Sequence, residues 1–169
     1  MLLLLYCTIF LFTFVTSVIV NTTETNSQGG IVKLQLDRII ECHLQPNGYN
    51  CDNKGKFTPV FYYDVLLEDC KTKYVGDCAH QYNSFSTLRA CQSNCRDASR
   101  KEMKGNLTAS VFCRLQPDFG QCNGYHPMFY FDLTLRTCRG FSYSGCGGNI
   151  NRFPTHQDCV TTCLSKIEY

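Results

Sequence analysis

Apolar residues gather first at the beginning of this 169-residue chain. The run from Leu2 to Val15 is almost unbroken, and no charged side chain occurs between Met1 and Val20. A membrane-spanning helix needs about 20 consecutive apolar residues, so this run is short for one and is typical of a secretory signal peptide. We predict a signal peptide over residues 1–20, cut near Ser17 to Val20. An uncleaved anchor is the alternative. No second run of this kind follows, which predicts a soluble mature chain without a membrane span.

Two short aromatic runs later in the chain predict β-strands. They are Phe61–Tyr63 and Phe129–Phe131, and large aromatic side chains favour strands. Each run is followed by an aspartate, Asp64 or Asp132, a residue type that favours turns. A second extended segment follows each aspartate, so the pattern predicts a β-hairpin in each half of the chain. We expect the aromatic rings to pack in small cores.

Helix starts are predicted at Thr87 and Thr155, because threonine is a preferred N-cap residue. Asp158 stands three residues after Thr155, a spacing that resembles a capping box. A Cys-x3-Cys pair follows each threonine. The i, i+4 spacing places both sulfurs of a pair on one helix face, where they can bond to the rest of the fold.

The cysteine content is far above ordinary usage, at 13 in 169 residues, and indicates a disulfide scaffold in an oxidising compartment. Removal of the signal peptide would remove Cys7 and leave an even number. The remaining cysteines fall into two sets of six whose intervals are 8, 18, 7, 12, 3 and 8, 15, 7, 12, 3 residues. This is a duplication. We call residues 42–95 the first repeat and residues 113–163 the second repeat.

The segments around the repeats are polar. Residues 21–41 form a leader in which Ile31–Leu36 alternates apolar and polar side chains, a weak strand signal. Residues 96–112 hold four basic and two acidic side chains, which predicts a flexible linker; contact with an acidic partner or a sulfated glycan is the less favoured alternative. Residues 164–169 are a C-terminal tail.

Candidate glycosylation sites fit a secreted chain, and the charge balance bears on its partners. Asn21 and Asn106 each begin an Asn-x-Thr acceptor sequence for N-glycosylation. The charge balance is bland, at 16 basic and 14 acidic residues, so no basic stripe suggests a nucleic-acid partner.

The cysteine spacing of the second repeat resembles that of the Kunitz domain of the pancreatic trypsin inhibitor family. Other residues typical of that family stand in register: Phe141, Gly145, Asn151 and Phe153. The resemblance implies a small disulfide-rich α+β fold of two tandem Kunitz domains, each a twisted β-hairpin with a C-terminal helix. It also implies six disulfides: Cys42–Cys95, Cys51–Cys78, Cys70–Cys91, Cys113–Cys163, Cys122–Cys146 and Cys138–Cys159. Each would contribute about 3–4 kcal/mol by the chain-entropy estimate.

The resemblance also implies a protease-binding loop around the second cysteine of a repeat. In the second repeat the loop comprises Gly120, Gln121, Cys122, Asn123, Gly124, Tyr125 and His126. The residue after the cysteine, Asn123, would fill the primary specificity pocket of the protease. Asparagine is neutral and cannot pair with the carboxylate of a trypsin-like pocket, which would cost a few kcal/mol relative to lysine or arginine.

The first repeat departs from the family pattern. Its possible second loop comprises Asn50, Cys51, Asp52 and Asn53, and the interval after Cys51 is three residues longer. An acidic Asp52 would be repelled by an acidic pocket, and a loop residue without a partner is nearly as good an interpretation. Lys73, Val75 and Asp77 replace Phe141, Tyr143 and Gly145. These departures put substrate-like binding by the first repeat in doubt.

We therefore expect a secreted, monomeric serine protease inhibitor that binds through the loop around Cys122 and Asn123, with surfaces outside the protease active site as a further mode of binding. Its partner would be an extracellular serine protease of the trypsin-like fold, with a coagulation factor plausible, because the tandem arrangement resembles two-Kunitz salivary anticoagulants and tissue factor pathway inhibitors. The alternative is a non-inhibitory binding module such as an ion-channel blocker using Lys54 and Lys56. Nothing specific supports a third possibility, an adhesive role.

No enzyme signature accompanies this pattern. The chain contains no Gly-x-Ser-x-Gly motif and no phosphate-binding loop, and its histidines lack metal-ligand spacing: His43, His80, His126 and His156. We expect no catalytic residue, no metal site and no cofactor.

Overall fold

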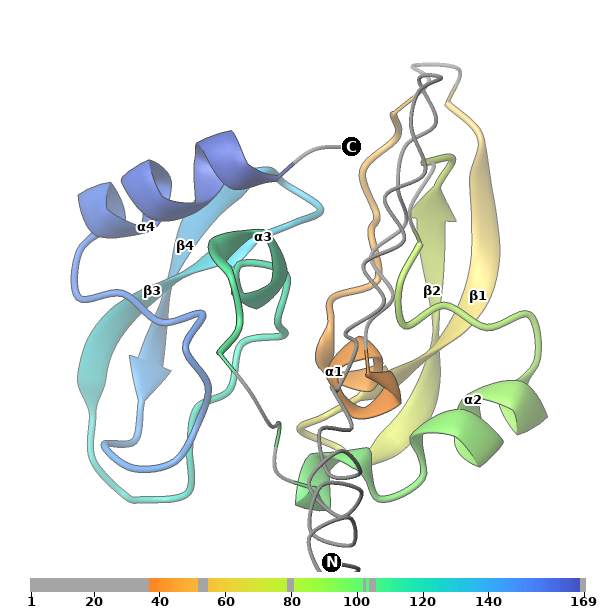
Figure 1. Ribbon diagram of the computed structural model, residues 1–169, viewed down its shortest axis with the longest axis horizontal. Coiled ribbons are helices and arrows are strands. Elements are labelled where there is room, and N and C mark those ends of the chain that lie inside the picture. Colours follow the sequence, from red (N-terminus) through yellow and green to blue (C-terminus); the bar gives the residue numbers. More distant parts are fainter. Residues whose placement is uncertain (1–36, 52–54, 79–80, 102, 104–105, 168–169) are drawn as a thin grey trace, which may run out of the picture. The chain divides into compact units, whose positions relative to one another are not determined.

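The computed structural model describes residues 37–51, 55–78, 81–101, 103 and 106–167 (Figure 1). The predicted signal peptide, Asn21 and the predicted strand Ile31–Leu36 lie outside these residues. Among the residues that the structure describes, none of the helices has the length and apolar character that a bilayer crossing requires. The elements are α1 Arg38–His43, β1 Phe57–Asp64, β2 Asp69–Gly76, α2 Leu88–Cys95, the 3-10 helix η1 Ala98–Arg100, α3 Ala109–Phe112, β3 His126–Asp132, β4 Thr137–Tyr143, α4 His156–Cys163 and the 3-10 helix η2 Leu164–Lys166.

Each repeat contains the predicted hairpin. Strand β1 pairs antiparallel with β2, with Tyr63 opposite Cys70, and β3 pairs with β4 in the matching register, with Phe131 opposite Cys138. The aspartate after each aromatic run closes the turn. Asp64 accepts hydrogen bonds from the backbone N–H groups of the two residues at 66 and 67, and Asp132 accepts one from Leu135 at 3.0 Å. The α+β fold class predicted from the sequence is confirmed.

The two longer helices begin at the predicted threonines. The hydroxyl of Thr87 accepts from the backbone N–H of Ala90 at 3.1 Å, and that of Thr155 accepts from Asp158 N at 3.0 Å. Thr155 also donates its hydroxyl proton to the Asp158 carboxylate at 2.6 Å, so the side chain three residues along completes the cap. N-caps of this kind satisfy backbone donors that have no partner within the helix.

Three disulfides in each repeat join the longer helix to the start of the repeat, the second strand to that helix, and the loop before the hairpin to the segment after it. The pairs are Cys42–Cys95, Cys51–Cys78, Cys70–Cys91, Cys113–Cys163, Cys122–Cys146 and Cys138–Cys159. This is the pairing that the resemblance implied. All the pairs have Cα–Cα distances between 5.1 and 6.2 Å, within the normal range for a disulfide. Each bond is internal to one repeat, so none of them links the repeats to each other.

A buried asparagine organises the backbone of each repeat. Asn83 is fully buried; its Oδ1 accepts from Tyr63 N at 2.9 Å and its Nδ2 donates to the carbonyls of Cys42, Leu44 and Tyr63. Asn151 repeats this arrangement around Phe131 in the second repeat. The amide thus joins the start of a repeat to its first strand, a connection that backbone hydrogen bonding alone does not supply.

The polar segment 96–112 is more ordered than the sequence predicts. It contains the 3-10 helix η1 and the short helix α3, and both bury an apolar side chain: Ala98 is 3% exposed and Val111 6%. Ala98 joins the apolar cluster of the first repeat. Val111 joins a cluster that takes residues from both sides of the segment: Ile40, Leu44, Tyr82 and Leu115. The segment predicted as a flexible linker therefore contains helical structure in two places.

Candidate functional site

The loop Gly120–His126 leads into β3, and hydrogen bonds and a disulfide hold it against the segment 144–146. Gln121 N donates to Cys146 O at 3.1 Å, and the Cys122–Cys146 disulfide lies beside that bond. Cys122 N donates to the hydroxyl of Ser144 at 3.0 Å, and Gly124 N donates to Ser144 O at 2.8 Å. Asn123 therefore lies between two anchored residues.

This loop is exposed despite these restraints. Every residue from 121 to 127 is exposed, and the ring of Tyr125 is the most exposed large hydrophobic side chain among the described residues, at 79%. An exposed segment normally samples many conformations. A loop that is fixed by a disulfide and hydrogen bonds loses little conformational entropy when a partner binds it.

Two glycines allow the backbone to approach this closely. Gly120 has a φ of 78°, and a Cβ atom there would lie 2.0 Å from Cys146 O. A Cβ atom at Gly124 would lie 2.6 Å from Ser144 O. Neither position accommodates a larger residue without moving the backbone, so both glycines are requirements of the loop conformation.

Polar and aromatic contacts of Arg152, Tyr143 and Asp118 support the loop. The guanidinium of Arg152 lies 3.7 Å from the centre of the Tyr143 ring and donates to Gly147 O at 3.2 Å, and the Tyr143 hydroxyl donates to the same carbonyl at 3.0 Å. Asp118 accepts from Gly120 N at 2.9 Å. Sequence reasoning missed Ser144, Asp118 and Arg152 as loop supports. Ser144 acts on a residue 22 positions away, which a single sequence does not reveal. Asp118 acts on the residue two positions along, and its side-chain contact to a nearby backbone N–H is a local turn signal that could have been recognised.

The corresponding loop of the first repeat is only partly described. Asp52, Asn53 and Lys54 lie outside the described residues, Cys51 and Asn50 are half-buried, and Lys56 is exposed. The three extra residues of the first repeat are divided between its first strand and its loop. Strand β1 has 8 residues against 7 in β3, so one residue lengthens the strand and the other two enlarge the loop.

Two departures from the family pattern, Lys73 and Val75, lie in β2 and have different consequences. In the second repeat, Phe141 packs on Phe119 and meets Tyr130 edge to face, with ring centres 5.9 and 5.8 Å apart. In the first repeat, Lys73 stands in the place of Phe141 and its ammonium donates to Pro46 O at 3.4 Å and to the hydroxyl of Thr134 at 3.2 Å. Burial lowers the pKa of Lys73, and the nearby Asp132 carboxylate opposes that shift. Val75, in place of Tyr143, is buried.

Other residues singled out in the sequence lie away from the loop. The predicted glycosylation site Asn106 is exposed, as is Thr108 of its acceptor sequence, and occupancy stays a prediction. His43 contacts Ile39 O at 2.7 Å, and the His156 ring meets Phe129 edge to face. Among the described residues, no group of three His, Cys, Asp or Glu side chains is arranged to hold a metal ion.

Comparisons with known proteins identify a family to which the second repeat, with the loop Gly120–His126, is similar. The model of the "Kunitz/Bovine pancreatic trypsin inhibitor domain" family matches residues 112–164. The "Actinia tenebrosa protease inhibitors" of Actinia tenebrosa are 34% identical over 114 residues, covering 66% of this chain but 40% of theirs, so the chain spans two fifths of that relative. The "Kunitz-type serine protease inhibitor bitisilin-3" of Bitis gabonica is 31% identical, covering 73% of this chain and 70% of that one. "Doenitin-1" of Haemaphysalis doenitzi is 29% identical, covering 63% and 76%.

Proposed function

Since this chain belongs to the Kunitz/bovine pancreatic trypsin inhibitor family, whose members are inhibitors and not enzymes, we propose that it is a secreted serine endopeptidase inhibitor acting through the loop Gly120–His126. The observation that carries this proposal is the combination of exposure and restraint in that loop. The loop is offered to solvent while a disulfide and three backbone donors hold it. A substrate-shaped segment that cannot relax binds a protease tightly, because little entropy remains to be lost.

Within this proposal, Asn123 enters the primary specificity pocket and Gly124 follows the bond that a protease would cleave. Tyr125, exposed beside them, supplies an aromatic contact, a side-chain type enriched among residues that dominate binding energy. The neutral amide of Asn123 suits a pocket with hydrogen-bonding groups at its floor better than one with a buried carboxylate. Extracellular proteases with such pockets are therefore the proposed targets, and coagulation proteases are included on the family resemblance alone.

An inhibition panel with the mature, oxidised protein tests this proposal. The enzymes are trypsin, chymotrypsin, elastase, plasmin, thrombin and factors Xa and VIIa, each with small and with protein substrates. Asn123→Lys should bind trypsin at least about 100-fold more tightly than the wild type, because its ammonium pairs with the carboxylate that asparagine leaves unpaired.

Gln157→Lys is the matched control. It adds the same charge at an exposed position on α4, away from the loop, and should leave trypsin inhibition unchanged. If neither the wild type nor Asn123→Lys inhibits any enzyme of the panel with either substrate, substrate-like inhibition is wrong for this protein.

A further inference from the structure

A short motif occurs at the start of both repeats and brings them together. Cys-x-Leu-Gln-Pro stands at residues 42–46 and again at 113–117. Leu44 and Leu115 form an antiparallel bridge, and both are fully buried. Gln45 N donates to Arg114 O at 2.7 Å, and Gln116 N donates to His43 O at 2.8 Å. Equivalent residues thus pair with each other, as they do across a two-fold axis in a symmetric dimer.

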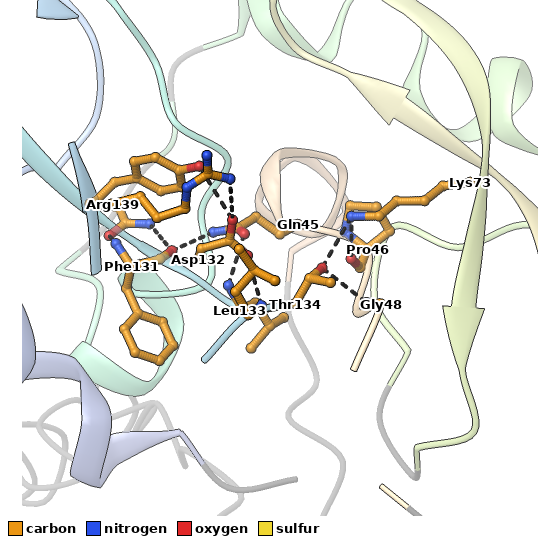
Figure 2. A network of polar contacts seen from close by, with 12 residues as sticks. Gln45, Pro46, Gly48, Lys73, Phe131, Asp132, Leu133, Thr134 and Arg139 are labelled. Atoms are coloured by element: carbon orange, nitrogen blue, oxygen red, sulfur yellow. Dashed lines mark hydrogen bonds and ion pairs between the residues drawn. The ribbon is translucent and has the colours of Figure 1, made fainter. Parts of the chain in front are cut away.

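The first glutamine of the motif reaches into the second repeat (Figure 2). The Nε2 of Gln45 donates to Leu115 O at 2.9 Å and to Phe131 O at 2.8 Å, and its Oε1 accepts from Leu133 N at 3.0 Å. Leu115, Phe131 and Leu133 are at most 1% exposed. The amide therefore satisfies backbone groups at the end of β3 that are shielded from water.

The second glutamine does the same in the first repeat. Gln116 Nε2 donates to Tyr63 O at 2.8 Å and to the carbonyls of Cys42 and Leu44 at 3.3 Å, and its Oε1 accepts from Val65 N at 3.4 Å. These carbonyls are the ones that accept from the buried Asn83 of that repeat. Each repeat therefore adds its glutamine to the asparagine-centred network of the other.

One edge of this contact is not symmetric. Thr134 of the second repeat accepts from Gly48 N and from the ammonium of Lys73, both at 3.2 Å (Figure 2). The guanidinium of Arg136 lies 4.9 Å from the centre of the Tyr49 ring. The equivalents of Lys73 and Thr134 in the other repeat are Phe141 and Leu66, which cannot form this hydrogen bond. Contacts that only the mixed pairing can make favour it over pairing of two like repeats.

We infer that the two repeats form one rigid body, with the Cys-x-Leu-Gln-Pro segment of each as the docking surface for the other, and that Lys73 serves this docking. The described residues of both repeats belong to one compact unit, as this requires. A partner that binds the loop of the second repeat therefore meets the first repeat at one fixed place. The inference does not depend on which protease is bound.

Residual dipolar couplings of the oxidised full-length protein test this inference. One alignment tensor should fit the backbone N–H couplings of β1–β2 and β3–β4 together. In the double variant Gln45→Ala/Gln116→Ala, the two hairpins should need tensors that differ in magnitude, because the repeats then reorient independently. Gln92→Ala, which removes an exposed glutamine on α2, is the control and should keep a single tensor.

Two outcomes would contradict the inference. Two tensors of different magnitude in the wild-type protein would overturn the inference. A single tensor in the double variant, with native disulfides and dispersed amide shifts, would show that the glutamines do not hold the repeats together and would also overturn it. If the double variant does not fold, Lys73→Met/Thr134→Val replaces it. This variant removes the hydrogen bonds that Thr134 accepts from Gly48 and Lys73 and the one that Lys73 donates to Pro46, and leaves both glutamines in place. It should raise the difference between the two fitted tensors above that of Gln92→Ala.

Discussion

Asn151 forms hydrogen bonds through both the oxygen and the nitrogen of its buried amide. Its replacement tests how much one side chain contributes to the free energy of unfolding. In Asn151→Ala, the N–H of Phe131 loses its acceptor and the carbonyl of Cys113 loses a donor, whereas Leu115 O and Phe131 O keep the Nε2 of Gln45. An unsatisfied buried polar group costs about 1–3 kcal/mol. We expect the free energy of unfolding to fall by about 2–4 kcal/mol, measured by guanidinium denaturation with intact disulfides. The exposed Asn123→Ala should change it by less than about 0.5 kcal/mol; equal effects of the two variants would contradict the assigned role.

The loop is the element in which geometry and function coincide. Gly120→Ala would bring a Cβ atom to 2.0 Å from Cys146 O at a φ of 78°, so the loop must shift. We expect inhibition of the most sensitive protease of the panel to weaken by at least about 10-fold, since a misplaced loop loses its preorganisation. Gly140→Ala is the control, because its Cβ atom would meet nothing nearer than 3.9 Å and should leave the inhibition constant unchanged. A similar constant for both variants would mean that the loop conformation does not matter.

At the scale of helices and strands, some elements can be predicted from the sequence and others cannot. The hairpins and capped helices follow from local signals: aromatic runs, a following aspartate and an N-cap threonine. Helix α1, with six residues, is too short for a periodic pattern, although Asp37 caps it. The segment 96–112 is polar enough to predict a tether, but Ala98 and Val111 are buried by contacts that only the fold creates.

In the candidate functional site, too, some residues can be predicted from the sequence and others cannot. The positions of Gly120 and Cys122 are recognisable through the resemblance to the family, because the cysteine spacing of the second repeat matches the family pattern. Ser144 supports the loop through a hydroxyl that contacts a residue 22 positions away, and a single sequence carries no signal for that. Glutamine is mostly exposed in proteins. Gln45 and Gln116 are nevertheless 8% exposed, a burial that composition and periodicity do not predict.

At the scale of the whole molecule, paired repeats should unfold together. In a calorimetric scan of the oxidised wild-type protein, we expect one transition whose calorimetric and van't Hoff enthalpies agree, with a ratio of about 1. In Gln45→Ala/Gln116→Ala the ratio should rise well above 1, because each repeat keeps its own three disulfides and melts alone. Two separate wild-type transitions would show that the repeats are energetically independent, and Gln92→Ala should match the wild type.

The reciprocal glutamines bear on how such a duplication is inherited. A freshly copied module with three disulfides of its own is expendable, and losing either copy leaves a working remainder. Once each copy contributes an amide to the interior of its neighbour and covers the neighbour's leucine, deletion of one exposes Leu44 or Leu115 to water and leaves the survivor less stable. The first copy is then free to diverge around its own loop while selection for stability keeps it in place.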